Sequence, residues 1–406
     1  MAQPATAEPV INEIAERFRI TSAEIHANPE TAFREHRAAA LLTDWLADEG
    51  FAVQRGVGGL DTAFVATSGA AIDARSRNRG PVIALLAEYD ALPGIGHGCG
   101  HNLIGAGAVL AASQLRRIVP GHAGTLAVIG TPGEEGGGGK IKLLDAGVFD
   151  GVDAALMFHP ADRTLVVRRA LAAAHVRVEF HGIAAHAAKN PADGRNALAA
   201  MIQLFVALDG LRQHIPDRAR IHGVIREGGK APNVIPDFTS AEFYVRDTTT
   251  ASTVDLLERF EACARGAAMA TGTQHTLVHT APMYSERRNN LAMAANLARH
   301  LDVAGVAVEE THEDNPAGSS DIGNVSMRTP TIHPYIQIAE RGTPGHSALF
   351  REAAASPHAH DMAERMALAL AGVVRDLLTD GEFLANARHE HETASQPSIP
   401  GPAVPA

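Results

Sequence analysis

The chain has few of the features that mark secreted or membrane proteins. It has 406 residues but only two cysteines, Cys99 and Cys263, too few for the disulfide framework of a small secreted domain. No apolar run approaches the roughly 20 residues that a membrane-spanning helix needs. The opening MAQPATAEPV lacks the basic and then apolar pattern of a secretory signal. These absences predict a cytoplasmic protein.

Basic residues are also in the minority. The chain has 35 Lys and Arg against 46 Asp and Glu, which gives a net charge of -11. This balance argues against nucleic acid or an anionic membrane as the main partner. Hydrophobic residues make up 46% and charged residues 20%, as is usual for globular proteins. The length exceeds what one hydrophobic core supports, so two domains are expected.

Three short apolar segments, at residues 81–87, 125–129 and 154–158, have the length and composition of buried strands. Helical patterns cover residues 10–51 and 103–117. The three strands lead into EYDALPGIGHGCGHN, TPGEEGGGG and HP. In open α/β sheets, ligands bind at the carboxyl ends of the strands. The pattern therefore predicts an α/β catalytic domain with its site in these loops.

From about residue 172 the pattern changes. A strand-like alternation is followed by a helix at about 194–214, by the strand-like runs IHGVIREGG and TSAEFYVRDT, and by a helix at 254–271. This β-α-β-β-α-β order predicts an inserted ferredoxin-like α+β domain. The predicted limits are 1–171 and 285–385 for a discontinuous catalytic domain and 172–284 for the insertion. Residues 386–406, rich in Pro, Ser and Ala without periodicity, are predicted to be disordered.

The loops contain candidate metal ligands. Cys99 and His101 are two residues apart, so in an extended segment both side chains face the same side, and thiolate and imidazole are preferred ligands of zinc. Glu134, Glu135 and His159 supply carboxylates and a further imidazole at neighbouring strand ends. Taken alone, the two glutamates are better explained as a solvated pair of loop carboxylates. Most histidines in proteins are surface or packing residues, so the argument depends on the three loops together.

Several motifs together resemble one enzyme family. They are EYDALPGIGHGCGHN, GTPGEEGGGGKIKLLDAGVFDGVDAALMFHP, HGIAAHAAKNPADGRNALAA, GGKAPNVIPD, SSDIGNVS and the opening IHANPETAFREHRAAALLTDWL. The chain resembles the dinuclear metallopeptidases and amidohydrolases of the aminoacylase-like family, peptidase family M20, over about residues 10–385. Within the family it is most similar to the branch of auxin-conjugate amidohydrolases, aminobenzoyl-glutamate hydrolase and β-alanyl-lysine type dipeptidases. The resemblance implies a phosphorylase/hydrolase-like catalytic domain, with a mixed sheet between helices, and a lid or dimerisation domain.

The resemblance implies a role for each loop residue. The implied ligands of two divalent ions, zinc or else manganese or cobalt, are Cys99, His101, Glu135, His159 and His346. Glu134 matches the general base, and Asp90 matches an aspartate that orients a ligand. Many relatives have His two residues before that aspartate, where this chain has Glu88. Asn102 replaces the Asp that is common in auxin-conjugate hydrolases, which favours the dipeptidase and aminobenzoyl-glutamate side.

The inserted domain contributes further candidates. His186 matches a lid histidine that, in dimeric relatives, reaches the partner's site and stabilises the oxyanion, so a homodimer is implied. Asn233 and Arg246 resemble residues that bind the oxyanion or the substrate carboxylate, a task for which the planar guanidinium is suited. A strand-end salt bridge is the structural alternative for Arg246. Three weaker candidates, treated as loop-shaping or pocket residues, are His97, Asp321 and Asn324.

The predicted activity is hydrolysis of an amide bond by a metal-activated water. The substrate would be a dipeptide or an N-acyl or aryl-acyl amino acid with a free carboxylate, with aminobenzoyl-glutamate as the alternative to a dipeptide. Two other hypotheses are a hydrolase with Cys99 as nucleophile, beside His97 or His101, and a non-catalytic metal-binding homologue. A cysteine dyad would leave Glu134 and the other strand-end residues unexplained.

Overall fold

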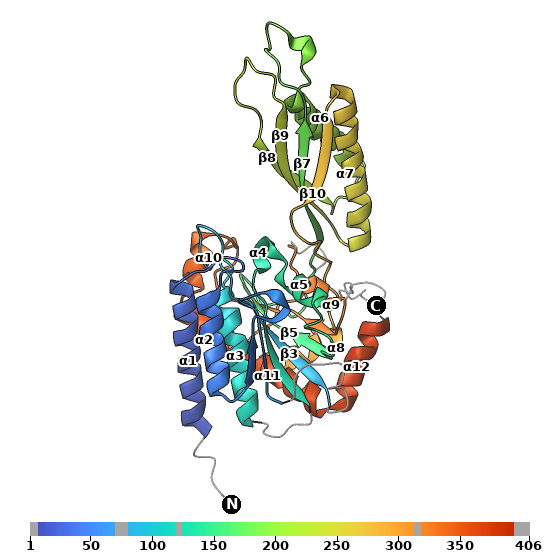
Figure 1. Ribbon diagram of the computed structural model, residues 1–406. Coiled ribbons are helices and arrows are strands. Elements are labelled where there is room, and N and C mark those ends of the chain that lie inside the picture. The colour runs from blue at the N-terminus through green and yellow to red at the C-terminus, as the bar shows by residue number, and fades with distance from the viewer. Residues whose placement is uncertain (1–6, 70–79, 119–123, 312–317, 394–406) are drawn as a thin grey trace, which may run out of the picture. The chain divides into compact units, whose positions relative to one another are not determined.

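The computed structural model describes residues 7–69, 80–118, 124–311 and 318–393. The chain forms two compact units (Figure 1). The larger unit comprises Met1–Arg169, Arg287–Ala317 and Asp321–Ala406, and the smaller unit comprises Ala170–Glu286 and Gly318–Ser320. In the described part of the chain, no helix has the length and apolar character needed to cross a bilayer.

The larger unit is built from helices and strands that alternate along the chain. Its helices are α1 (Ala7–Ala27), α2 (His36–Asp48), α3 (His101–Ile118), α4 (Glu134–Gly137), α5 (Gly139–Asp145), α8 (Leu291–Val303), α9 (Ile322–Ser326), α10 (Ala348–Ala353), α11 (Pro357–Thr379) and α12 (Gly381–Thr393), with a 3-10 turn η1 at Val57–Gly59. Its strands are β1 (Ala52–Arg55), β2 (Phe64–Thr67), β3 (Val82–Ala87), β4 (Thr125–Gly130), β5 (Ala154–Leu156), β6 (His159–Ala161), β11 (Thr331–Ile332) and β12 (Tyr335–Gln337).

The central sheet has the strand order β1-β2-β4-β3-β5-β11. Strands β4, β3, β5 and β11 are parallel, while β1 and β2 pair antiparallel at one edge. A separate parallel pair, β6 and β12, continues beyond β5 and β11 in the chain. This mixed sheet between helices confirms the predicted α/β fold.

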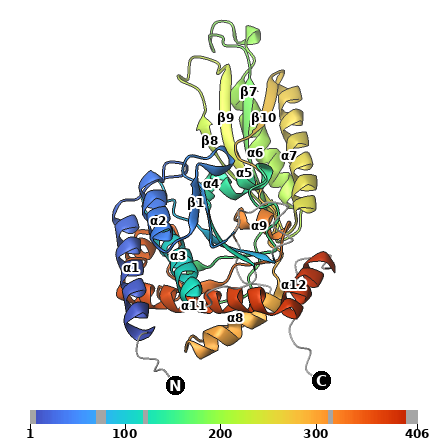
Figure 2. The ribbon, with the colours of Figure 1, turned by 60° about the horizontal axis from the view of Figure 1, so that its bottom comes forward.

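Strand β3 shows why the central segments are apolar throughout. Ile83 and Leu85 pack in the cluster that contains residues of α1, α3, α8 and α11 (Figure 2), while Ala84 and Leu86 pack on the other face with residues of α5 and α9. All six residues of β3 are buried. A strand covered on both faces must be apolar at every position, so its carboxyl end is where polar residues can enter.

The N-terminal helical region is two helices rather than one. Residues 28–35 separate α1 from α2, and Pro29 disfavours a helical conformation in the residue before it. The Glu30 carboxylate then accepts hydrogen bonds from the backbone N–H groups of Arg37 and Ala38, which satisfies two donors at the start of α2.

The predicted disorder of residues 386–406 is wrong for its first part. Helix α12 continues to Thr393, because Leu384 and Ala387 are buried in the core of the larger unit. Glu390 also accepts hydrogen bonds from the backbone N–H groups of Leu291 and Ala292, at 2.6 and 2.9 Å, and so caps the start of α8. The remaining residues, 394–406, lie outside the described part of the chain.

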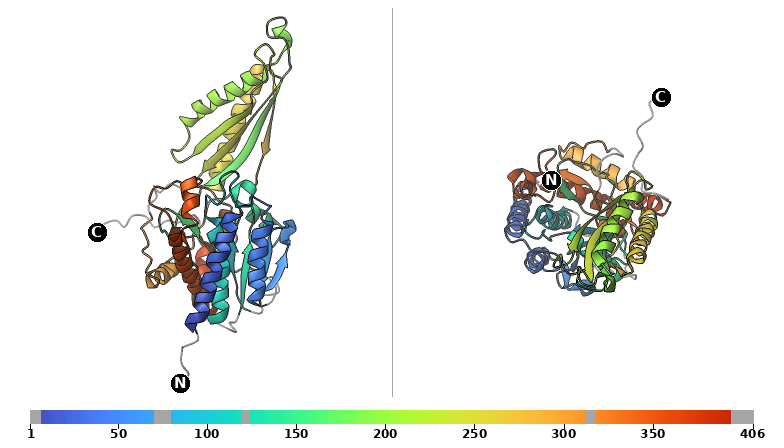
Figure 3. Two further views of the ribbon diagram at one scale, coloured as in Figure 1. Left: turned by 90° about the vertical axis from the view of Figure 1, so that its left-hand side faces the viewer. Right: turned by 90° about the horizontal axis from the view of Figure 1, so that it is seen from above.

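The smaller unit is a four-stranded antiparallel sheet with two helices. Its elements are β7 (Ala172–His181), a 3-10 turn η3 (Pro191–Asp193), α6 (Ala197–Arg212), β8 (Arg220–Glu227), β9 (Phe238–Asp247), α7 (Thr250–Thr271) and β10 (Gln274–His279). The strand order is β10-β7-β9-β8, and α6 and α7 pack together over one face (Figure 3). Val176, Val178 and Phe243 point to those helices. This order of strands confirms the ferredoxin-like prediction.

Candidate metal centre

The GHGCGHN loop leads from the region after β3 into α3. Gly100 has φ of +74°, a conformation that L side chains rarely adopt, and a Cβ there would lie 2.8 Å from Cγ of Pro160. The loop therefore needs glycine beside its two functional residues. Cys99 and His101 flank Gly100, and both are buried.

Four of the five predicted ligands meet around this loop. One donor atom from each of Cys99, His101 and Glu135 lies within 4.8 Å of the others. His346 joins them, because its Nε2 is 3.6 Å from Oε1 of Glu135. The His346 backbone N–H also donates to the Gly98 carbonyl at 3.1 Å, and its φ of +57° is unusual for a residue with a side chain. The chain is thus held in a rare conformation at one of the residues that meet here.

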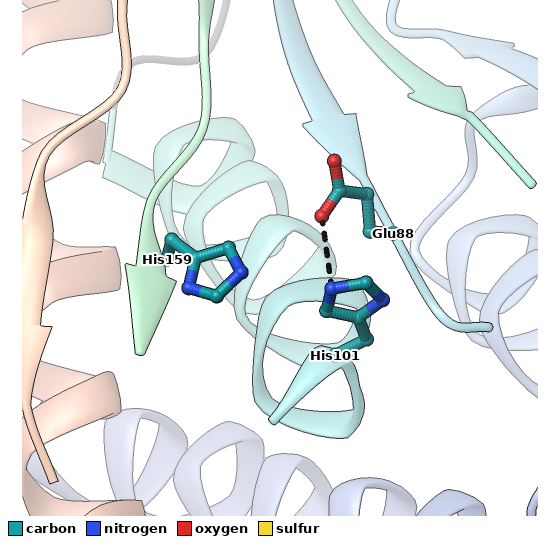
Figure 4. A group of neighbouring side chains, drawn as sticks. All are labelled: Glu88, His101 and His159. Atoms are coloured by element: carbon teal, nitrogen blue, oxygen red, sulfur yellow. Dashed lines mark ion pairs between the residues drawn. The ribbon is translucent and has the colours of Figure 1, made fainter. Parts of the chain in front are cut away.

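His159 belongs to a second group that overlaps the first. Donor atoms of Glu88, His101 and His159 lie within 4.8 Å of one another (Figure 4). The Nδ1 atom of His159 is 2.7 Å from the Pro160 carbonyl, so its Nε2 is the atom left for a metal. Both His101 Nε2 and Glu88 Oε2 are buried; they lie 3.5 Å from each other, and neither has a hydrogen-bond partner among the described residues. Thiolate, imidazole and carboxylate donors with such unsatisfied atoms fit a pair of divalent ions.

Asp90 connects two of the candidate ligands. Its Oδ1 is 3.0 Å from Nδ1 of His101, and its Oδ2 accepts a hydrogen bond from the Glu135 backbone N–H at 3.0 Å. Burial raises the pKa of Asp90, but the adjacent His101, the hydrogen bond from the Glu135 backbone and the charge of Lys140 together bring that pKa below its usual value. An ionised Asp90 orients His101 so that Nε2 faces the ligand group.

The electrostatics of the ligands favour metal binding over thiol catalysis. Burial raises the pKa of the Cys99 thiol well above its usual value, and the nearby Glu135 raises it further. Burial lowers the pKa of His101, but Asp90 and Glu88 outweigh it and raise that pKa to about 10. Burial lowers the pKa of His159 to about 3. A divalent ion would displace the protons of Cys99 and His101, whereas an unassisted Cys99 stays protonated and is a poor nucleophile.

Glu134 is buried beside this group. Burial raises its pKa well above the usual value, and the charge of Glu135 raises it further. A carboxylate with a raised pKa accepts a proton more readily than an exposed one. The two adjacent glutamates are therefore suited to different tasks. Glu135 lies beside the other candidate metal ligands, and Glu134 is suited to accept a proton.

Asn102 has a structural role that the sequence did not show. Its side-chain amide donates to Ser22 Oγ at 2.9 Å and to the Ala354 carbonyl at 3.1 Å. It therefore ties the start of α3 to α1 and to the end of α10. An ionised Asp could not donate either hydrogen bond.

Several buried polar residues near the site were not identified from the sequence. Lys140 bonds to Glu88 and to Asp321, and Asp321 is among the weaker candidates that the sequence predicts. Lys140 follows the run of four glycines after the glutamate pair, a signal that could have pointed to it. His333 is buried 5.7 Å from His159 between ring centroids, and the buried Arg287 donates to the Tyr335 hydroxyl.

The candidate site residues of the smaller unit lie in two separate regions of that unit. His186 and Asn233 are exposed and adjacent, since the Ala187 backbone N–H donates to the Asn233 carbonyl at 3.0 Å. Arg246 lies opposite Ala173, at the beginning of β7, whereas His186 follows the end of that strand. Ala173 and His181 are eight residues apart on β7. At ~3.3 Å per residue, they lie about 26 Å from each other.

Arg246 makes no ion pair with the described residues, so a strand-end salt bridge does not explain it. Its guanidinium lies 5.3 Å from the Tyr244 ring centroid, and its buried Nε has no hydrogen-bond partner in the part of the chain that the structure describes. Burial lowers the pKa of His175 to about 4, and the positive charge of Arg246 contributes to that shift. An unpaired guanidinium of this kind suits an anionic ligand.

The fold and the buried donor set define a metal-dependent hydrolase of amide bonds. The peptidase dimerisation domain matches residues 168–271. The Xaa-Arg dipeptidase of Mus musculus is 36% identical over 95% of this chain and 91% of its own length. One of the subunits of the p-aminobenzoyl-glutamate hydrolase of Escherichia coli is 37% identical over 64% of this chain and 56% of its own length.

The fold agrees with these sequence matches. A crystal structure of a dinuclear metal-binding peptidase of the M20 family from Bacillus subtilis aligns with a TM-score of 0.65 and 23% identity, over 89% of this chain and 99% of that one. The protein belongs to the M20 family of metal-dependent peptidases and amidohydrolases.

Proposed function

We propose that the protein is a dipeptidase that cleaves an amide bond whose leaving half is an amino acid with a free carboxylate. The carrying observation is the convergence of Cys99, His101 and Glu135 beside the buried Glu134. The likeness to an Xaa-Arg dipeptidase over 95% of the chain supports a dipeptide with a basic C-terminal residue as the first substrate to test.

Five residues would hold the two ions: Cys99, His101, Glu135, His159 and His346. Bound divalent ions supply an acidified water and polarise the scissile carbonyl. Glu134 accepts the water's proton and delivers it to the leaving nitrogen, a task that a carboxylate bound to metal could not perform freely. Asp90 keeps His101 oriented through Nδ1 during both steps.

We propose zinc as the native metal, with manganese or cobalt as alternatives. One thiolate and three imidazoles are soft or borderline donors, which zinc accepts more readily than magnesium or calcium does. Both cysteines are free thiols, with Cys99 buried and Cys263 half-buried, which supports the reducing cytoplasm as the location.

We propose that the protein is a homodimer, and the arrangement of the smaller unit supports this. His186 and Arg246 lie at opposite ends of the same sheet, so one copy of that unit cannot bring both to one small substrate. In a symmetric dimer, one chain can supply Arg246 and the other His186 to the same site. The match to a peptidase dimerisation domain over residues 168–271 supports this arrangement.

A hydrolysis screen tests the proposal. The purified protein, loaded with zinc or manganese, is incubated with Xaa-Arg and other dipeptides, N-acyl amino acids and aminobenzoyl-glutamate. Release of the free C-terminal amino acid from dipeptides is the expected result. Preferential cleavage of aminobenzoyl-glutamate would support the second candidate, which the 37% identity to a p-aminobenzoyl-glutamate hydrolase chain favours. No cleavage of any of these compounds would refute both.

A further inference from the structure

Lys140 lies in the first turn of α5, and its side chain is completely buried. Its ammonium donates to Oε1 of Glu88 and to Oδ1 of Asp321, the latter at 2.7 Å. Its backbone N–H donates to Oδ2 of Asp321 at 2.9 Å, so Asp321 holds the residue at two points. Removing an ammonium from water is costly unless carboxylates compensate it, and here two carboxylates do so directly.

A third carboxylate belongs to the same cluster. One oxygen from each of Glu88, Glu134 and Asp321 lies within 4.8 Å of the other two. Three carboxylates at this separation repel one another, and such groups in proteins are often held together by a divalent cation. The ammonium of Lys140 provides the compensating charge as a permanent part of the chain.

The cluster is connected to the metal centre through Glu88. While Oε1 of Glu88 accepts from Lys140, its Oε2 lies 3.5 Å from Nε2 of His101. Figure 4 shows this carboxylate directed at the His101 ring from the end of β3. The position of Lys140 therefore fixes the orientation of a carboxylate that faces a candidate ligand.

We propose that Lys140 is a positioning residue whose ammonium takes the place of a third cation among Glu88, Glu134 and Asp321, and thereby holds Glu134 where it accepts the proton of the attacking water. The inference rests on the proposed role of Glu134 as general base. Lys140 and Asp321 would then affect the reaction indirectly, because they position Glu134 and Glu88.

The double variant Lys140→Met/Asp321→Asn separates positioning from charge balance. It removes one positive and one negative charge, so the net charge of the cluster is unchanged, and the new side-chain amide can still accept from the backbone N–H of residue 140. We expect a folded protein that binds two ions per chain and has an unchanged KM. Its kcat should fall by about 10²-fold, as for a catalytic group displaced by about 1 Å. Lys142→Met, an exposed change in the same helix, should leave kcat and KM unaltered.

Metal content and structure provide readouts besides activity. A crystal structure of the metal-loaded double variant should show the Glu134 carboxylate moved away from Glu88, whereas an unmoved carboxylate overturns the proposal. A kcat equal to that of wild type also overturns it, because the ion-pair network is then only structural. Loss of metal from the folded variant overturns it as well, since Lys140 would then serve ion retention.

A single substitution tests the same proposal if the double variant does not fold. Asp321→Asn alone keeps Lys140 but weakens its anchor, and we expect kcat to fall about tenfold with KM unchanged, as for loss of one charge-assisted hydrogen bond. An unchanged kcat would contradict the proposal. If wild-type enzyme cleaves no amide, the proposed function fails, while the position of Glu134 in crystal structures of wild type and variant still decides the role of Lys140.

Discussion

The two units place their functional groups in opposite ways. In the larger unit, Cys99 and His101 are buried, and their donor atoms lie within 4.8 Å of Glu135, the chain neighbour of the buried Glu134. In the smaller unit, His186 is exposed, and Arg246 lies at the other end of the sheet. The first arrangement can bind its ions within one chain. The second arrangement places its two candidate residues too far apart on one sheet for both to contact the same small ligand.

Removal of metal should have the largest effect. Chelator treatment is expected to abolish hydrolysis completely, and added zinc or manganese should restore it, because the proposed mechanism needs bound divalent ions to acidify the water. Activity and bound metal are measured together. Full activity in a metal-free protein would instead support catalysis by the Cys99 thiol.

Substitution of the proposed base is next. Glu134→Gln should lower kcat by about 10²–10⁴-fold, since it removes proton transfer while keeping the shape of the side chain. Bound metal, measured by elemental analysis, should remain at two ions per chain. Glu134→Ala with full activity would show that the buried glutamate has no catalytic role.

His186 tests whether the smaller unit acts on the site of another chain. His186→Ala should lower kcat by about 10²–10³-fold if this side chain stabilises the oxyanion. A mixture of His186→Ala and Glu134→Gln chains, dissociated and reassembled, should regain about one quarter of wild-type activity, because half the dimers are mixed and each has one intact site. No recovery in dimers shown to be mixed would place His186 in the site of its own chain.

Glu35 allows a test of burial within the larger unit. Burial raises its pKa to about 7, above the ordinary 4.5, although it accepts hydrogen bonds from Thr62 and from the backbone of Gly133. The unfolded chain therefore loses this proton first as pH rises, and the stability of the folded state falls between about pH 4.5 and 7, by about 3 kcal/mol in all.

Glu35→Gln should remove that loss. The free energy of unfolding of the variant, measured by urea titration, should increase relative to wild type as pH rises from 5 to 8. Glu16→Gln, an exposed change on α1, is measured over the same pH range as the control. If the difference between Glu35→Gln and wild type stays constant with pH, the raised pKa of Glu35 is contradicted.

Asn102 should show the smallest effect. Asn102→Asp loses two hydrogen-bond donors to Ser22 and to the Ala354 carbonyl, so we expect destabilisation by about 1–3 kcal/mol. Thermal unfolding of the metal-loaded protein measures it. An unchanged melting temperature would show that α3 does not depend on this amide.

Much of the larger unit could be predicted because its signals are local. A buried parallel strand needs an apolar run such as Val82–Ala87, and the polar residues that follow it mark the carboxyl edge of the sheet. The α12 helix was missed for the opposite reason. Its stability comes from contacts of Ala387 and Glu390 with α8, which lies about a hundred residues earlier in the chain.

The sequence by itself determined the fold class, the family and the loops that carry the donors, because these follow from periodicity and from short motifs. Only the tertiary structure decided that Lys140 joins Glu88 and Asp321, and that His186 and Arg246 lie at opposite ends of one sheet. Both facts depend on pairings between distant segments. The physical reason is that a motif fixes which groups are present, while strand register and burial fix which of them meet.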